Sequence, residues 1–127
     1  MKSILLIEDD PFIAEIYSTK LKEEGFEVDT VQEGKSAFKI IKEKKPDLLL
    51  LDVVLPNIDG WEILRKVKQT PELSHIKIII LSNLEERPEI EKGFQLGADK
   101  YLVKAHYTPK DVICEVKKVL TPEKRNA

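Results

Sequence analysis

Polar side chains that can bind cations or phosphoryl groups follow four of the short apolar runs in this sequence. Three acids, Glu8 to Asp10, follow the first run, Asp52 follows another, and Ser82 and Lys104 follow two later ones. Two carboxylates about 4 Å apart repel by roughly 4 kcal/mol at an effective dielectric near 20, so acids that meet at one site need a cation between them. An open site of two or three carboxylates suits Mg²⁺, which keeps several waters and binds phosphoryl oxygens, better than Ca²⁺. These residue types could therefore bind Mg²⁺ and a phosphoryl group together.

Five short runs are expected to form the strands that position these residues. They are Ile4–Ile7, Glu27–Val31, Leu48–Leu51, Ile76–Leu81 and Tyr101–Val103. Most are nearly continuous in apolar residues, which is typical of strands buried on both faces of a sheet. The second run contains polar residues, so we expect that strand to be partly exposed.

The segments between and after these runs repeat apolar residues three and four positions apart, as amphipathic helices do. The repeating residues are Phe12, Ile13, Ile16, Tyr17 and Leu21; Ala37, Ile40 and Ile41; Ile63, Leu64 and Val67; Ile90 and Phe94; and Val112, Ile113, Val116, Val119 and Leu120. Strands and helices that alternate in this way predict an α/β, doubly wound fold, in which helices cover both faces of a parallel sheet.

The predicted fold also explains why the polar groups should meet. Ligands of an open parallel sheet bind beyond the carboxyl ends of the strands, where the strand order reverses. If the order is 2-1-3-4-5, the first and third strands are neighbours, and Asp52 meets Glu8 to Asp10 in one crevice. Lys104 would add a positive charge there. Each residue alone has an ordinary explanation, such as a helix cap or a solvated loop, but their occurrence at the ends of four strands indicates a site.

The composition indicates one domain. The chain has 127 residues, of which 42% are apolar and 35% charged, with a formal net charge of -2. This balance gives no reason to expect direct nucleic-acid binding, and no apolar run approaches the ~18 residues of a membrane span. The single cysteine, Cys114, cannot form an internal disulfide, and no apolar leader precedes the first strand, so we expect a cytoplasmic protein. We expect residues 1–120 to form the domain and residues 121–127 to be a polar tail or the start of a linker.

Four segments resemble the receiver domain of two-component response regulators. They read "ILLIEDDPFI", "PDLLLLDVVLPNIDGWEIL", "IIILSNLEE" and "GADKYLVKA", and the resemblance covers residues 2–120. It implies a flavodoxin-like fold with a five-stranded parallel sheet in the order 2-1-3-4-5 and five helices. It also implies a signalling domain, not an enzyme, that accepts a phosphoryl group from a sensor histidine kinase.

The resemblance assigns a role to each acid of the site. Asp52 is the implied phospho-acceptor, and Glu8 and Asp9 are the acid pair that holds Mg²⁺, with Asp9 the more direct ligand. The backbone carbonyl of Val54 is the remaining implied protein ligand, and no cofactor other than Mg²⁺ is implied. A carboxylate that attacks phosphorus forms a reactive acyl phosphate, which must be stabilised by countercharge.

The resemblance also implies a switch. Ser82 is expected to hydrogen-bond the phosphoryl group, Lys104 to pair with it, and the Tyr101 ring to turn inward as Ser82 moves. The implied result is a changed surface over the fourth helix, fifth strand and fifth helix, which a downstream protein or an output domain would recognise. The kinase, the target and phosphorylation-dependent dimerisation stay open.

Two positions depart from the family pattern. Lys104 is followed by Ala105, where proline is usual, often through a cis bond. A cis bond before a non-proline residue costs about 3 kcal/mol, so the conformation of this bond stays open. Asn83 stands where a small residue is common, next to Ser82.

The residues two positions beyond Asp52 and Ser82 bear on the main alternative function. Small phosphatases of the aspartyl-phosphate type resemble this site but need a second aspartate two residues after the nucleophile, where this chain has Val54. Val54 and Leu84 are apolar and should hinder a hydrolytic water, so we predict slow autodephosphorylation.

Two further alternatives lack their phosphate-binding loops. A flavin-binding electron carrier needs a hydroxyl- and glycine-rich loop where this chain has Glu8 to Asp10. A nucleotide triphosphatase needs a glycine five residues before the Gly of Gly34-Lys35-Ser36, and this chain has none there. A degenerate receiver that acts only as a scaffold is disfavoured because all the site side chains are retained.

Overall fold

The computed structural model describes residues 1–54 and 59–120; residues 55–58 and the predicted tail, 121–127, lie outside the described part. Strands and α-helices alternate along the described chain as predicted. They are β1 (Ser3–Ile7), α1 (Pro11–Glu23), β2 (Glu27–Val31), α2 (Gly34–Lys44), β3 (Leu48–Leu51), α3 (Gly60–Gln69), β4 (Lys77–Ser82), α4 (Arg87–Gln95), β5 (Lys100–Val103) and α5 (Pro109–Leu120). Short 3₁₀ turns form at η1 (Pro71–Leu73) and η2 (Lys104–His106). Within this part of the chain, no helix has the length and apolar character needed to cross a membrane.

The five strands form one parallel sheet in the order β2-β1-β3-β4-β5, which confirms the predicted topology. Each observed strand end differs by no more than one residue from its prediction. In the register of the sheet, Ile7 pairs with Leu51 and Ser82 with Val103. The last residues of neighbouring strands therefore lie side by side, which brings the residues that follow them to one edge.

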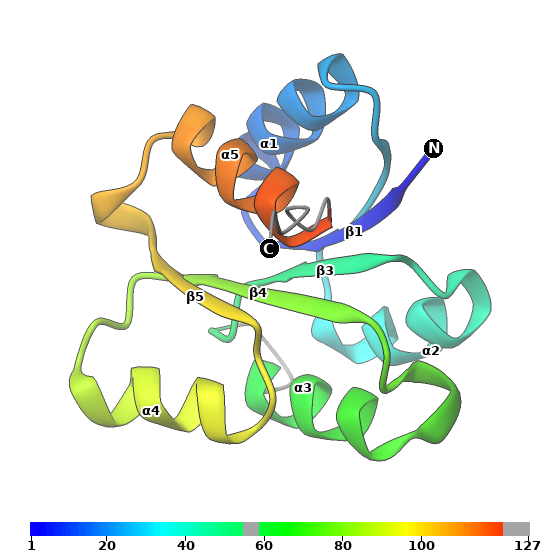
Figure 1. The fold of residues 1–127 in the computed structure, drawn as a ribbon, viewed down its shortest axis with the longest axis vertical. Coiled ribbons are helices and arrows are strands. Elements are labelled where there is room, and N and C mark those ends of the chain that lie inside the picture. The colour runs from blue at the N-terminus through cyan, green and yellow to red at the C-terminus, as the bar shows by residue number, and fades with distance from the viewer. Residues whose placement is uncertain (55–58, 121–127) are drawn as a thin grey trace, which may run out of the picture.

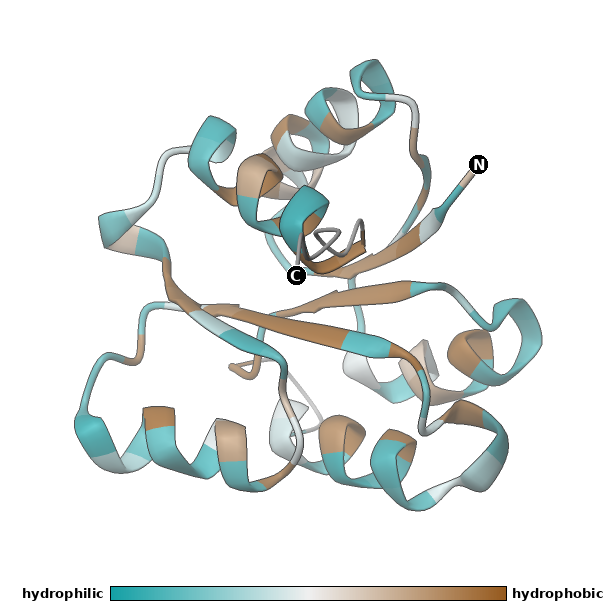
Figure 2. Ribbon diagram, viewed as in Figure 1, coloured by the Kyte–Doolittle hydropathy of each residue, from teal (hydrophilic) through white to brown (hydrophobic). Residues whose placement is uncertain are grey.

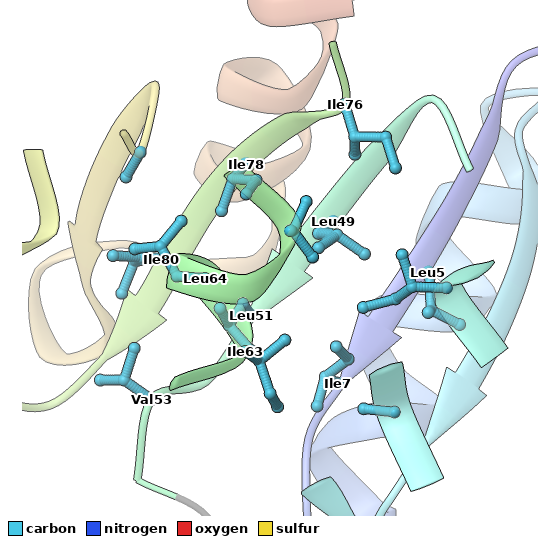
Figure 3. Close-up of a cluster of buried hydrophobic side chains, with 14 of the residues drawn as sticks. Leu5, Ile7, Leu49, Leu51, Val53, Ile63, Leu64, Ile76, Ile78 and Ile80 are labelled. Carbon is cyan, nitrogen blue, oxygen red and sulfur yellow. The ribbon is translucent and has the colours of Figure 1, made fainter. Parts of the chain in front are cut away.

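Helices cover both faces of the sheet, as the alternation of elements predicts (Figure 1). Helices α1 and α5 pack on one face, and α2, α3 and α4 lie on the other. Each central strand contributes alternate side chains to the two cores, so most of its residues are apolar, whereas the helices keep hydrophilic outer faces (Figure 2). Figure 3 shows the core on the face covered by α2, α3 and α4, where strand side chains such as Leu49 and Ile78 pack with Leu64 of α3.

Three apolar residues of the predicted helix faces are exposed to solvent. Phe12 and Ile16 of α1 are 80% and 46% exposed, and Phe94 of α4 is 49% exposed. The spacing predicted the two helices correctly. These three side chains nevertheless point to solvent, because other residues of α1 and α4 form the buried faces. In α1 the buried face is centred on Ala14, Tyr17 and Leu21.

Candidate functional site

The acids of the site are placed by two adjacent strands. The N–H of Glu8 donates to the Val31 carbonyl (3.0 Å), and the N–H of Asp52 donates to the Ile7 carbonyl (3.0 Å), so the ladder continues one residue past β1 and β3. Both side chains are buried, with 2% of Glu8 and 6% of Asp52 exposed. Apolar strands thus present two carboxylates side by side at the carboxyl edge of the sheet, where burial raises the cost of an unpaired charge.

Lys104 reaches these two carboxylates from the β5 edge of the sheet and bridges them. Its Nζ donates to Glu8 Oε1 at 2.8 Å and to Asp52 Oδ2 at 2.9 Å. The lysine follows the edge strand β5 and its side chain is only 15% exposed, so it reaches past the end of β4 to the acids. Residues that are 96 and 52 positions apart in the chain therefore form one ionic cluster.

The pKa values of the cluster show how strongly burial acts on it. Burial raises the pKa of Glu8 above its ordinary value, and the hydrogen bond from Lys104 offsets this only in part. Burial alone would lower the pKa of Lys104, but the hydrogen bonds to Glu8 and Asp52 and the negative charges of these acids together outweigh burial and raise that pKa. One ammonium therefore does not fully compensate the buried negative charge, and a further cation would find a favourable potential here.

Three carboxylates offer ligand atoms for such a cation. One oxygen from each of Glu8, Asp9 and Asp52 lies within 4.8 Å of the others. At that distance each pair of charges repels by roughly 3.5 kcal/mol at an effective dielectric near 20. The donors are all hard oxygens, two buried and one, Asp9, exposed to solvent, so the set fits a hydrated Mg²⁺.

Asp10 is not part of this carboxylate set, because it serves the following helix. Its Oδ1 accepts from the N–H groups of Phe12 (2.9 Å) and Ile13 (3.3 Å), which makes it the N-cap of α1. Its own N–H donates to Glu8 Oε2 (3.1 Å), so the cap also helps to hold the Glu8 carboxylate in place.

Val54 folds back towards the site through its backbone. Its N–H donates to Asp52 Oδ1 (2.9 Å), which leaves Asp52 Oδ2 towards Lys104. The Val54 side chain is 57% exposed and supplies no acid or base at the position where an aspartyl-phosphate phosphatase needs one. The predicted role of the Val54 carbonyl as a metal ligand stays a prediction.

Ser82 and Tyr101 are joined through the loop that follows β4. The Ser82 side chain is fully buried, and its Oγ accepts from the Leu84 N–H (3.2 Å). The Tyr101 hydroxyl donates to the Leu84 carbonyl at 2.6 Å. Ser82 and Tyr101 are thus linked by one residue, Leu84, in a loop that begins at the site.

Lys104 begins the turn η2, and its bond to Ala105 is trans, since the described residues contain no cis peptide. Asn83 is exposed, beside Lys104 and Ala105 in a cavity of about 290 Å³ between α1 and the loop after β5. The cavity volume itself lies at the small end for a ligand site.

Gly60 supports the site but was not identified from the sequence. A Cβ at this position would lie 2.3 Å from Val53 Cα and 2.8 Å from the Asp52 carbonyl oxygen, so only glycine allows α3 to pack against the acceptor backbone. The Gly60 N–H also donates to the Val53 carbonyl (3.1 Å). The sequence signal that could have found it is the Asp59-Gly60 pair directly before an amphipathic helix.

Comparisons with known proteins agree with this geometry. The model of the response regulator receiver domain family matches residues 4–116. The phosphate regulon transcriptional regulatory protein PhoB of Rhizobium meliloti is 38% identical over 120 residues, which cover 94% of this chain and 52% of that protein. The transcriptional regulatory protein AfsQ1 of Streptomyces coelicolor is 39% identical over 104 residues, which cover 82% and 45%. The chain spans about half the length of these relatives.

A solved structure extends the comparison to three dimensions. The beryllofluoride-activated receiver domain of DrrB, a Thermotoga maritima homologue of OmpR and PhoB, superimposes with a TM-score of 0.83 at 32% identity. The match covers 94% of this chain and 97% of that domain.

Proposed function

Because this chain belongs to the response regulator receiver domain family and is a receiver of two-component signal transduction, we propose that it accepts a phosphoryl group on Asp52 beside a bound Mg²⁺. The observation that carries the proposal is the buried cluster in which the Lys104 ammonium bridges Glu8 and Asp52. Asp9 adds a third carboxylate at the open side of this cluster. We propose Glu8, Asp9 and Asp52 as the side chains that hold the metal.

The chain's own residues can perform the transfer by positioning and countercharge. An Asp52 oxygen attacks the phosphorus, and the bond from phosphorus to the donor's leaving atom breaks, so the donor keeps the electron pair of that bond. Mg²⁺ held by Glu8, Asp9 and Asp52 would supply positive charge to the phosphoryl oxygens. We propose that Lys104 exchanges its contact with the Asp52 carboxylate for one with the phosphoryl group, and that Ser82 hydrogen-bonds the phosphoryl group.

The proposed donor is a phosphohistidine of a sensor histidine kinase, and the proposed output is a changed surface over α4, β5 and α5. Tyr101 lies on this route, because its hydroxyl is bound to the loop that begins at Ser82. The relatives that this chain matches are about twice its length, so the recipient of the signal would be an output domain or a separate protein.

The phosphotransfer proposal is tested with a small donor. The protein is incubated with acetyl phosphate in Mg²⁺ or in chelator, and its intact mass is measured. We expect a phosphate-sized mass gain only with Mg²⁺, and borohydride reduction followed by proteolysis should place the modified residue at Asp52. Equal gain in chelator, or modification at another residue, would contradict the proposal.

Asp9→Asn should weaken Mg²⁺ binding without destabilising the fold. Asp9 is exposed, so its carboxylate contributes to the metal and not to the core. We expect the affinity to fall at least about tenfold, equivalent to about 1.4 kcal/mol, in calorimetric titrations. Asp10→Asn is the matched control, because asparagine caps a helix as well as aspartate does and Asp10 lies outside the metal set. Equal losses in the two variants would exclude Asp9 as a ligand.

The acyl phosphate should be long-lived, because Val54 and Leu84 offer no polar group to orient a water. After donor removal in Mg²⁺, we expect the phosphate to persist for minutes in a mass time course. Val54→Asn should shorten this lifetime at least about fivefold, or about 1 kcal/mol of barrier, whereas Val54→Ile should leave it unchanged. Loss of the phosphate from the unmodified protein within seconds would refute the prediction.

A further inference from the structure

Gly93 is the buried residue of helix α4. A Cβ there would lie 2.8 Å from Ile80 Cδ1, 3.0 Å from Tyr101 Cδ2 and 3.5 Å from Trp61 Cζ3. Glycine in a helix interior destabilises the helix by about 1 kcal/mol relative to alanine. Glycine at position 93 therefore lowers the stability of the helix but allows close packing, and the neighbours that it packs against include the Tyr101 ring.

The Tyr101 ring is held at two points. One edge of the ring lies where a Cβ at Gly93 of α4 would be 3.0 Å from Tyr101 Cδ2, and the hydroxyl donates to the Leu84 carbonyl at 2.6 Å. Leu84 in turn donates its N–H to Ser82 Oγ at 3.2 Å. A displacement of the ring would therefore break the hydroxyl bond and change the loop that positions the Ser82 hydroxyl at the site.

The same part of α4 also contacts the start of α3. Lys92 Nζ lies 4.8 Å from the centre of the Trp61 ring, a cation–π contact, and Trp61 is 8% exposed. Gly60, the preceding residue, packs on the backbone of the acceptor segment. Trp61 is the single tryptophan of the chain, so its fluorescence reports on the region where α4 meets α3.

We propose that Gly93 is a positioning residue for the phosphoryl site: without a side chain it lets α4 close against the Tyr101 ring and hold it in the orientation that favours a phosphorylated Asp52. The inference rests on the proposed phosphotransfer function and adds a residue of α4 that sets its energetics. If the phosphoryl site is formed best in this ring orientation, a change that lowers the fraction of molecules in it must weaken binding of a phosphoryl group or its mimic, because the apparent affinity scales with that fraction.

The test separates the ring from the rest of the core. Ile80→Val removes Cδ1, the atom closest to a Cβ at position 93, so Gly93→Ala in that background leaves the Tyr101 ring as the tightest neighbour. Affinity for beryllofluoride, a phosphoryl mimic, is measured in Mg²⁺ from Trp61 fluorescence. We expect Gly93→Ala to weaken binding roughly fivefold or more, within the usual range of coupling between sites.

A double-mutant cycle with Tyr101→Ala provides the control. Once the ring is removed, Gly93→Ala should change the affinity by a factor of about one, because the two residues act through one contact. Equal losses with and without the ring, or no loss with it, would overturn the proposal. So would failure of the Ile80→Val, Gly93→Ala protein to fold by circular dichroism, because the ring could then not yield by turning outward. If the unmodified protein neither binds beryllofluoride nor gains phosphate, the phosphotransfer function fails instead.

Discussion

Asp52→Asn is expected to abolish the mass gain that acetyl phosphate and Mg²⁺ produce. An amide lacks the anionic oxygen that attacks phosphorus, and it cannot form the acyl phosphate. We expect the initial rate to fall by at least about 100-fold, equivalent to roughly 2.7 kcal/mol or more of barrier. The amide oxygen can still accept the Val54 N–H that Asp52 Oδ1 accepts now, so the loop should keep its shape and the loss should be chemical.

Asp59→Asn is the matched control for this loss. Asp59 is an exposed aspartate at the N-cap of α3, where its Oδ1 accepts from the Trp61 N–H at 3.0 Å. Asparagine caps helices equally well, so the same chemical change is made seven positions from Asp52 without removing a site carboxylate. The control should gain phosphate at the rate of the unmodified protein. Full labelling of Asp52→Asn would exclude Asp52 as the acceptor.

The parallel sheet and its covering helices could be predicted because the strands are apolar for a simple physical reason, whereas the order of the strands was implied only by the family resemblance. Central strands of a parallel sheet are covered on both faces, so a run such as Leu48–Leu51 must be continuous in apolar residues. The partly polar run Glu27–Val31 proved to be the edge strand β2, where Glu27, Asp29 and Thr30 are exposed. With this order, Asp52 is expected to lie beside the acids that follow β1, because β1 and β3 pair and their last residues are in register.

Details that depend on a neighbouring element could not be predicted from spacing. Phe12 and Phe94 have the spacing of core residues but face outward, because the sheet and adjacent helices cover other sides of α1 and α4. The importance of Gly60 and Gly93 comes from backbone or ring atoms of distant segments that a Cβ would meet, and a sequence shows only that a side chain is absent. Lys104 was likewise expected only to add a positive charge, and the sequence did not predict that it would bridge Glu8 and Asp52.

Lys104 also determines how much the two buried carboxylates lower the stability of the folded protein. Glu8 and Asp52 are nearly fully buried, and Lys104 is the cation that contacts both. Its pKa is raised above the ordinary 10.5, so the stabilisation from its charge is present through neutral pH and is lost only as the pH rises through the raised value. Lys104 therefore remains charged, and paired with the ionised acids, at neutral pH.

Lys100→Met provides a matched reference for removing this charge. Lys100 lies in the neighbouring part of β5 and pairs with Glu115 at 2.9 Å, a distance like those made by Lys104. Its side chain is 39% exposed, so water screens the pair. We expect Lys100→Met to change the free energy of unfolding by less than about 1 kcal/mol.

Lys104→Met should lower the free energy of unfolding by about 2 to 3 kcal/mol in chelator, because it leaves two buried carboxylates without their cation. Added Mg²⁺ should restore most of this loss, since a metal at Glu8, Asp9 and Asp52 supplies the missing positive charge, and it should stabilise the variant more than the unmodified protein. Urea unfolding followed by circular dichroism, with and without Mg²⁺, measures both effects. If Lys104→Met and Lys100→Met were equally stable in chelator, the carboxylates would not depend on Lys104 for compensation. If Mg²⁺ stabilised Lys104→Met no more than the unmodified chain, the metal would not share the carboxylates that the lysine now binds.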